Sequence, residues 1–268
     1  VPVFKGNYEQ SMTAGVAAYR AGAAPDILQV FEVGTASMFY ADGVTKSVSE
    51  IMEESGTPLD LNDYIPAVAS YYTSPNGQLL SLPFNSSTTV LYYNKDAFEK
   101  AGLDPNKPPK TWEEMRVVTE ALKASGSSCP MTTTWMGWTQ LESFSSWHNK
   151  PVATKNNGFD GLDVELLLNE PLQVRRMTNL SDMAKEGLFV YKGRADAGSP
   201  AFISGECAIM MGSSGTYGTI QRDAKFAFGE STLPYYADVE GAPQNTVIGG
   251  ASLWVMNGKP ADNYKGVA

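Results

Sequence analysis

Residues 78–93, Gln78-Leu-Leu-Ser-Leu-Pro-Phe-Asn-Ser-Ser-Thr-Thr-Val-Leu-Tyr-Tyr93, contain two apolar stretches separated by a short polar segment. The stretches at 78–84 and 88–93 each predict a strand, and Asn85-Ser86-Ser87 joins them. A helix is expected directly afterwards, at residues 95–101, because Gly102 can end it. We infer that a new structural unit begins here and that strands or short segments, rather than a flexible linker, connect the two parts.

Outward from this junction, helical and strand-like patterns alternate along the chain, which is typical of an α/β fold. Thr111-Trp-Glu-Glu114 is a capping box that opens one of the expected helices. The other expected helices lie at residues 9–23, 47–55, 61–72, 138–147 and 172–186, with one more ending near 223. Strands are expected at residues 26–31, 129–134, 207–211 and 226–233, and residues 246–256 form a nearly continuous apolar stretch.

Composition excludes several classes of function. The 268 residues carry 20 Lys and Arg against 29 Asp and Glu, a formal net charge of −9, which disfavours binding to nucleic acid or to an anionic bilayer. One histidine and two cysteines cannot form a His-rich or four-cysteine metal site, and we expect no metal and no cofactor. Cys129 and Cys207 form either a disulfide or two buried thiols.

Both ends of the sequence look cut. The first residue is Val1, and no charged-then-apolar leader precedes it. Near the other end, residues 260–264 read as a helix start without an apolar face to follow. We expect a truncated chain, although a short exposed tail would explain the second feature.

Three polar loops follow expected strands or lie between them, where open α/β sheets bind ligands. Gly212-Ser-Ser-Gly215 leads a strand into a helix and could present backbone N–H groups to an anion, or it is an ordinary serine cap. Glu32 directly follows a strand, so it is either a hydrogen-bond acceptor for substrate hydroxyls or a solvated charge. The segment from Asn85 to Thr88 is either a polar turn or a binding loop.

Trp135 and Trp138 stand three residues apart around Gly137, after a run of threonines that marks a strand end. Such a pair can form an aromatic wall for a sugar or polyol, or hold a quaternary ammonium group, and the alternative is core packing. Catalysis is poorly supported, since no nucleophile or metalloprotease motif occurs and we expect His148 to be structural or on the surface. Glu32 with Asp160 or Asp163 could form a glycosidase pair, but no spacing singles one out.

Several segments together carry a resemblance to a known family. They are Lys5-Gly-Asn-Tyr8-Glu-Gln, Gln29-Val-Phe-Glu32-Val-Gly-Thr, Pro83-Phe-Asn-Ser-Ser87-Thr, Leu91-Tyr-Tyr-Asn-Lys-Asp-Ala-Phe98, Lys155-Asn-Asn-Gly-Phe-Asp160-Gly, Ala242-Pro-Gln-Asn245 and Gly249-Gly-Ala-Ser-Leu-Trp-Val-Met256. From end to end the chain resembles the periplasmic sn-glycerol-3-phosphate-binding proteins of bacterial ABC importers. These are a branch of the extracellular solute-binding proteins of the maltose-binding class.

The resemblance implies a two-lobed, periplasmic-binding-protein-like (type II) α/β fold, here partial, that closes about a hinge with the ligand between its lobes. It implies lobe I at residues 1–86 with 250–268 and lobe II at 87–249, both incomplete. Residue by residue, it implies the following ligand contacts: Tyr8, Glu32, Ser87, Trp135, Trp138, Ser213 and Gly250. Family members extend before Val1 and well beyond Ala268.

The function expected from the resemblance is that of a monomeric, non-enzymatic binding protein. It would deliver sn-glycerol 3-phosphate, or a diester such as glycerophosphocholine, to the permease subunits of an ABC transporter, with no nucleic-acid partner. It would be periplasmic or lipid-tethered, after export by a signal peptide absent from this chain. An oligosaccharide-binding protein of the same fold and a carboxylate-pair hydrolase are the alternatives.

Overall fold

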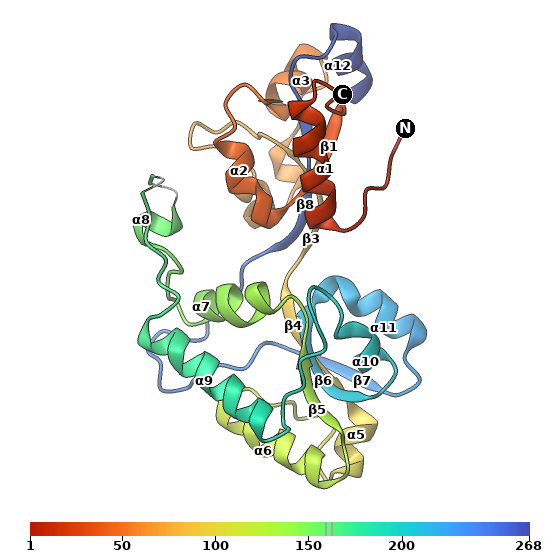
Figure 1. Ribbon diagram of the computed structural model, residues 1–268, viewed down its shortest axis with the longest axis vertical. Helices are drawn as coiled ribbons and strands as arrows, with labels where there is room; N and C mark the ends of the chain where they lie inside the picture. Colours follow the sequence, from red (N-terminus) through yellow and green to blue (C-terminus); the bar gives the residue numbers. More distant parts are fainter. Residues whose placement is uncertain (159, 162) are drawn as a thin grey trace. The chain divides into compact units, whose positions relative to one another are not determined.

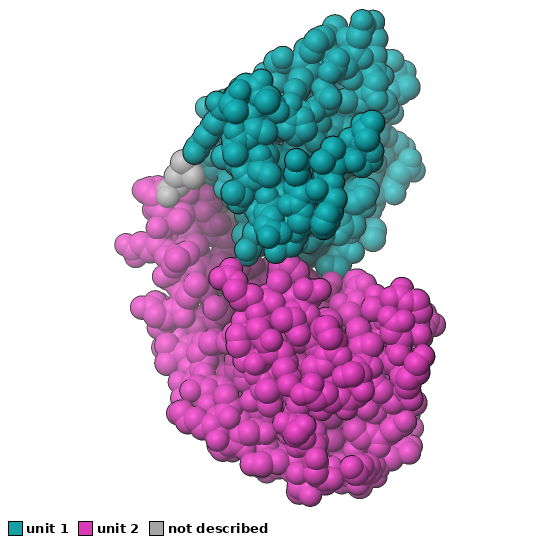
Figure 2. Space-filling model, turned by 45° about the vertical axis from the view of Figure 1, so that its right-hand side comes forward, with its two compact units in different colours: residues 1–87, 248–268 teal, residues 88–247 magenta. Residues whose placement is uncertain are grey.

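The chain forms two compact units (Figure 2). The computed structural model describes residues 1–158, 160, 161 and 163–268, so Phe159 of the 155–161 segment lies outside the described residues. Unit 1 contains residues 1–87 and 248–268, and unit 2 contains residues 88–247. The chain therefore crosses from unit 1 to unit 2 after Ser87 and returns before Ile248.

Unit 1 is built on the long strand β8 (Gly249–Met256), which pairs antiparallel with three other strands. These are β1 (Ile27–Phe31), β2 (Thr45–Lys46) and β3 (Leu82–Ser87). Helices pack around this sheet (Figure 1): α1 (Tyr8–Arg20), α2 (Thr35–Phe39), α3 (Val48–Glu54), α4 (Pro66–Tyr71) and α12 (Ala261–Val267), with 3₁₀ turns η1 (Glu32–Gly34) and η2 (Leu61–Asp63). Trp254, fully buried, packs with Leu28 and Val30 in the core of this unit.

Unit 2 contains a mixed sheet in the order β5-β6-β4-β7, in which only β5 and β6 are parallel. Its strands are β4 (Thr89–Asn94), β5 (Cys129–Thr133), β6 (Cys207–Ser213) and β7 (Phe228–Ser231). Its helices are α5 (Lys95–Lys100), α6 (Trp112–Ala124), the π-helix η3 (Trp138–Glu142), α7 (Ser143–Trp147), α8 (Thr154–Asn157), α9 (Pro171–Lys185), α10 (Ser199–Ile203), the 3₁₀ turn η4 (Ser214–Thr216) and α11 (Tyr217–Asp223). The interior faces of α6 and α9 bury Met115, Leu122 and Leu180 in the main core of this unit.

The alternating α/β character is confirmed, and three local expectations need correction. Asn85, Ser86 and Ser87 are not a connector, since they form the second half of β3 and pair with Gly249, Gly250 and Ala251. Residues 138–142 are a π-helix rather than the start of an α-helix. Residues 261–267 do form a helix with an apolar face.

That face of α12 consists of Tyr264 and Val267, which stand three residues apart and pack against the cluster around Val255. Spacing of three places two side chains on one side of a helix. The segment thus buries apolar surface, contrary to the expectation from its composition.

The cysteines form a disulfide, Cys129–Cys207, across the parallel pair β5 and β6. The two residues stand directly opposite each other in the strand register, with Cα atoms 4.5 Å apart. Within the described ranges no helix is long and apolar enough to cross a membrane.

Candidate functional site

Glu32 lies at the carboxyl end of β1, where the strand turns into η1. Its carboxylate Oε2 accepts a hydrogen bond of 3.2 Å from the backbone N–H of Gly250 in β8. Its carbonyl accepts another, also 3.2 Å, from the hydroxyl of Tyr71. Both the main chain and the side chain of Glu32 are therefore held, and a fixed carboxylate is a good acceptor for ligand hydroxyl groups.

Tyr8 begins α1 directly after the cap residue Asn7, whose side chain closes a capping box with Gln10. The Tyr8 ring stacks on Phe31, with centroids 5.6 Å apart and planes 16° apart. Its hydroxyl accepts a hydrogen bond of 3.1 Å from the side-chain amide of Asn85 in β3. The Asn85 contact was not predicted, although the polar cluster that contains it was singled out in the sequence.

Gly250 and Ser87 belong to the paired strands β8 and β3. Gly250 has φ +116°, a conformation that favours glycine, and a Cβ there would lie 2.0 Å from the carbonyl oxygen of Asn85. Ser87 ends β3 opposite Gly249. Unit 1 thus brings Tyr8, Glu32, Asn85 and Gly250 into one hydrogen-bonded and strand-paired group, which we call the unit 1 group.

Trp135 follows the end of β5, and Ser213 ends the neighbouring parallel strand β6. Thr133 pairs with Met211 in that ladder, so Trp135 and Ser213 each lie two residues beyond the last pair. Trp135 has φ +47°, in the left-handed region that bulky residues avoid, and its backbone N–H donates to the Ala195 carbonyl at 2.7 Å. Strained residues of this kind cluster at binding sites.

The two indoles differ in exposure, so they do not form a symmetrical wall. Trp135 is partly exposed, whereas Trp138 is buried, with 8% of its surface accessible. Trp138 begins the π-helix η3, and π-turns occur frequently at functional sites. Within unit 2, Trp135 and Ser213 are the predicted contacts that keep accessible surface.

After β6 the structure contains the serine cap that the sequence left as the alternative to an anion site, and two backbone N–H groups of the loop already have acceptors. Gly215 N–H donates to Ser213 Oγ at 3.1 Å, and Ser214 N–H donates to the Thr88 carbonyl at 2.8 Å. Gly250 N–H is likewise engaged by Glu32. Ser213 Oγ accepts in its bond to Gly215, so its hydroxyl hydrogen can still be donated to a ligand.

His148 is structural, as expected. It is fully buried, its Nδ1 lies 2.7 Å from the Phe144 carbonyl, and its Nε2 accepts from the Tyr236 backbone N–H at 2.9 Å. Burial lowers the pKa of His148, which favours the neutral ring that this pattern requires. Of the carboxylates considered for hydrolysis, Asp163 forms an ion pair with Lys155.

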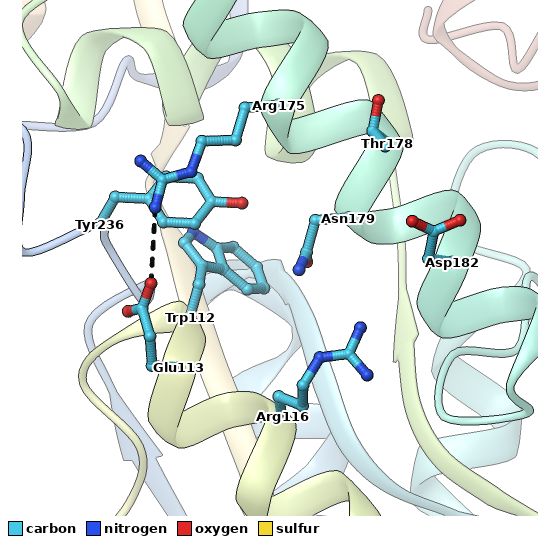
Figure 3. A pocket seen from close by; sticks show the side chains of 8 residues that line it. All are labelled: Trp112, Glu113, Arg116, Arg175, Thr178, Asn179, Asp182 and Tyr236. Atoms are coloured by element: carbon cyan, nitrogen blue, oxygen red, sulfur yellow. Dashed lines mark ion pairs between the residues drawn. The ribbon is translucent and has the colours of Figure 1, made fainter.

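A cavity of about 420 Å³ lies in unit 2 between α6 and α9 (Figure 3). Its lining includes Trp112, Asn179 and Tyr236 but none of the predicted contacts. Two of its arginines are already paired: Arg175 with Glu113 and Asp238, and Arg116 with Glu120 and Glu186. Among the described residues, no group of three or more His, Cys, Asp or Glu side chains could hold a metal ion.

Comparison with known proteins gives a family and a set of relatives. A family model described as bacterial extracellular solute-binding protein matches residues 1–267. The sn-glycerol-3-phosphate-binding periplasmic protein UgpB of Yersinia pestis is 55% identical over all of this chain and 61% of its own length. Its namesake from Salmonella typhimurium is 53% identical over the same shares. The chain thus spans about three fifths of the length of these curated relatives.

Solved structures agree on the fold. UgpB from Mycobacterium tuberculosis, in complex with glycerophosphocholine, superimposes with a TM-score of 0.80 at 22% identity, over 98% of this chain and 64% of that one. Maltose-bound MalE3 of T. maritima gives a TM-score of 0.76 at 18% identity, over 96% of this chain and 64% of its own. The partial type II binding-protein fold is therefore confirmed.

Proposed function

The chain belongs to the bacterial extracellular solute-binding proteins, and from this premise we propose that it binds sn-glycerol 3-phosphate or a glycerophosphodiester without altering it. The unit 1 group carries the proposal. It combines a carboxylate held by a backbone amide with a tyrosine hydroxyl oriented by Asn85. The names of the relatives at 53–55% identity support the choice of ligand.

Each part of the ligand has a chemically suitable partner. Glu32 accepts hydrogen bonds from the glycerol hydroxyls, and its negative charge keeps the phosphate away from it. The phosphate contacts hydroxyl groups, those of Tyr8, Ser87 and Ser213, rather than backbone amides. Trp135 packs on the polyol carbon atoms or on the substituent of a diester.

In this proposal lobe I (residues 1–86 and 250–268) and lobe II (87–249) differ from unit 1 and unit 2 by one residue at the first crossing and two at the second. The protein acts outside the cytoplasmic membrane, in the periplasm or tethered beside it, as a monomer. It passes its ligand to the permease subunits of an ABC importer and catalyses no reaction.

Calorimetric titration of the complete protein tests the proposal. We expect saturable binding of sn-glycerol 3-phosphate or glycerophosphocholine and no heat of binding from maltose. Glu32→Ala should raise the Kd about 10- to 150-fold, which corresponds to a lost hydrogen bond to a charged group of about 1.5–3 kcal/mol. Glu53→Ala, which removes an exposed carboxylate from α3 of the same unit, is the matched control and should leave the Kd unchanged.

Binding of maltose without binding of either phosphate ester would contradict the proposal and favour an oligosaccharide-binding protein. Release of glycerol or phosphate from the diester would favour a hydrolase. An unchanged Kd in Glu32→Ala would remove the assigned role of that carboxylate.

A further inference from the structure

Arg176 in α9 is a fully buried arginine whose hydrogen-bond acceptors are neutral. Its Nη1 donates to Asn179 Oδ1 at 3.2 Å, and its Nε donates to Gln140 Oε1 at the same distance. Its Nη2 donates to the same Gln140 oxygen. The guanidinium stacks on Trp112, with Cζ 3.4 Å from the ring centroid. Burying a charge on uncharged acceptors costs free energy, so core stability alone is a poor reason for an arginine here.

Gln140 lies in the π-helix η3 and connects Arg176 to the ends of β5 and β6. Its Nε2 donates to Thr133 Oγ1 at 2.8 Å. The Thr133 hydroxyl in turn donates to the Met211 carbonyl at 3.1 Å. Gln140 Nε2 also donates to Met211 Sδ at 3.7 Å, so neighbours set the orientation of the whole side-chain amide.

The residues beside this connection are the predicted contacts of unit 2. Thr139, next to Gln140, bonds back to the segment before η3: its N–H donates to the Trp135 carbonyl at 2.9 Å and its hydroxyl to the Thr134 carbonyl at 2.8 Å. Met211 precedes Ser213 by two residues in β6. The hydrogen bonds from Thr139 therefore connect the position of η3 to the strained backbone of Trp135.

We propose that Arg176, acting through Gln140, is a positioning residue that holds the π-helical turn and so fixes Trp135 for ligand binding. The role of Arg176 in ligand binding rests on the proposed function, whereas its effect on the conformation of Trp135 is independent of that function. A π-turn closes its hydrogen bonds over one residue more than an α-helix and is rare in proteins. The two donors from Arg176 to one amide oxygen restrain the side chain of a residue within this turn.

Arg175, the adjacent residue, provides a matched control. Its guanidinium lies 3.7 Å from the centroid of the Tyr236 ring and pairs with the exposed carboxylate of Asp238. It also pairs with the exposed carboxylate of Glu113 (Figure 3). It has the same side chain on the same helix, but it contacts Tyr236, Glu113 and Asp238 instead of Gln140. Arg175→Met therefore removes a stacked guanidinium without touching the connection to η3.

The test labels the complete protein with 5-fluorotryptophan and follows the fluorine resonances in the absence of ligand. The signals of the five tryptophans within residues 1–268 are assigned by single substitution. In Arg176→Met we expect shifted or broadened signals from Trp135 and Trp138. Trp254 in unit 1 should remain unchanged. Arg176→Lys, which can still donate to Gln140, should restore part of the wild-type spectrum, and Arg175→Met should leave the Trp135 signal in place.

Gln140→Glu separates positioning from stability. It gives Arg176 a charged partner, so the melting temperature should not fall, but it removes the donor to Thr133 and should still disturb the Trp135 signal. Ligand affinity should weaken about two- to thirtyfold in Arg176→Met and in Gln140→Glu, the range for residues that act on a site through others.

Wild-type Trp135 signals in both Arg176→Met and Gln140→Glu would overturn the proposal, as would equal changes in Arg175→Met. So would affinity losses that simply follow the melting temperature across the series. If the wild-type protein binds neither phosphate ester, the proposed function fails, and the ligand-free spectra still decide whether Arg176 positions Trp135.

Discussion

We expect an added methyl group to lower the free energy of unfolding most at Gly250. Its φ of +116° is rarely adopted by other residues, and an added Cβ would lie 2.0 Å from the Asn85 carbonyl oxygen and 2.9 Å from Ser86 Cα. Cβ atoms in proteins essentially never come closer than 3.0 Å to such atoms. Gly250→Ala therefore requires β3 and β8 to separate by about 1 Å or to break their pairing, since the obstructing atoms are backbone.

The expected cost has two parts. Overpacking in a well-packed region costs about 1–3 kcal/mol, and a side chain forced to positive φ costs about 1–2 kcal/mol more. The sum is a loss of about 2–5 kcal/mol in the free energy of unfolding. For a chain of 268 residues that lowers the melting temperature by about 4–20 °C. The affinity should also fall, because the Gly250 N–H that holds Glu32 moves with the strand.

Gly258→Ala isolates the second part of the cost. Gly258 also has a positive φ, +77°, but a Cβ there would meet nothing within 4 Å. The difference between the two variants, measured by thermal and urea unfolding, is then the cost of the clash, about 1–3 kcal/mol. If Gly250→Ala is no less stable than Gly258→Ala, the close approach of β3 to β8 described above is wrong.

Three further predictions concern other groups. Glu32→Gln keeps an oxygen that can accept from Gly250 N–H, so the melting temperature should hold while calorimetry shows an affinity about tenfold weaker; equal affinity would mean that the charge is not used. His148 is held neutral with a lowered pKa, so its unfolded state binds the proton first and the free energy of unfolding should fall as the pH drops below about 6.5. Melts of His148→Gln between pH 7 and 5 should be flatter, and equal slopes would refute this assignment. Replacing both Cys129 and Cys207 by Ala opens a loop with a sequence separation of 78 and should cost up to about 4.5 kcal/mol, and an unchanged melting temperature would contradict the disulfide.

Local sequence signals predicted the elements that are stabilised locally. The capping box at Thr111 and Glu114 forms as expected, with Glu114 N–H donating to Thr111 Oγ1 at 3.1 Å. The helix that this capping box opens is α6, and the apolar stretch noted at residues 246–256 contains β8. In each case the residues that decide the structure are neighbours in sequence.

Elements whose structure depends on residues far away in the sequence were not predicted. Residues 85–87 look like a turn because they are short and polar, but pairing with β8, more than 160 residues later, makes them a strand. The π-turn at Trp138 depends on Gln140 meeting Arg176 from α9, and no periodic signal reveals such a contact. The same holds for the loop after β6, where the carbonyl of Thr88, the residue between β3 and β4, accepts a hydrogen bond from the Ser214 N–H that composition alone leaves available.

The candidate site was predicted through the family resemblance more than through spacing. Spacing alone left open whether Glu32 is a solvated charge or a hydrogen-bond acceptor for a ligand. The structure adds that Gly250 N–H fixes its carboxylate and that Asn85 orients Tyr8. It also shows that the backbone N–H groups of Ser214, Gly215 and Gly250 have acceptors within the protein.

Phosphorus NMR of the complete protein with glycerophosphocholine tests the central claim most directly, because one spectrum reports both binding and chemical change. At stoichiometric concentrations we predict a shifted, broadened phosphodiester resonance that returns to its free position, undiminished, when excess sn-glycerol 3-phosphate displaces it. An unshifted resonance for both esters, or the appearance of inorganic phosphate or a new monoester signal, would contradict the account.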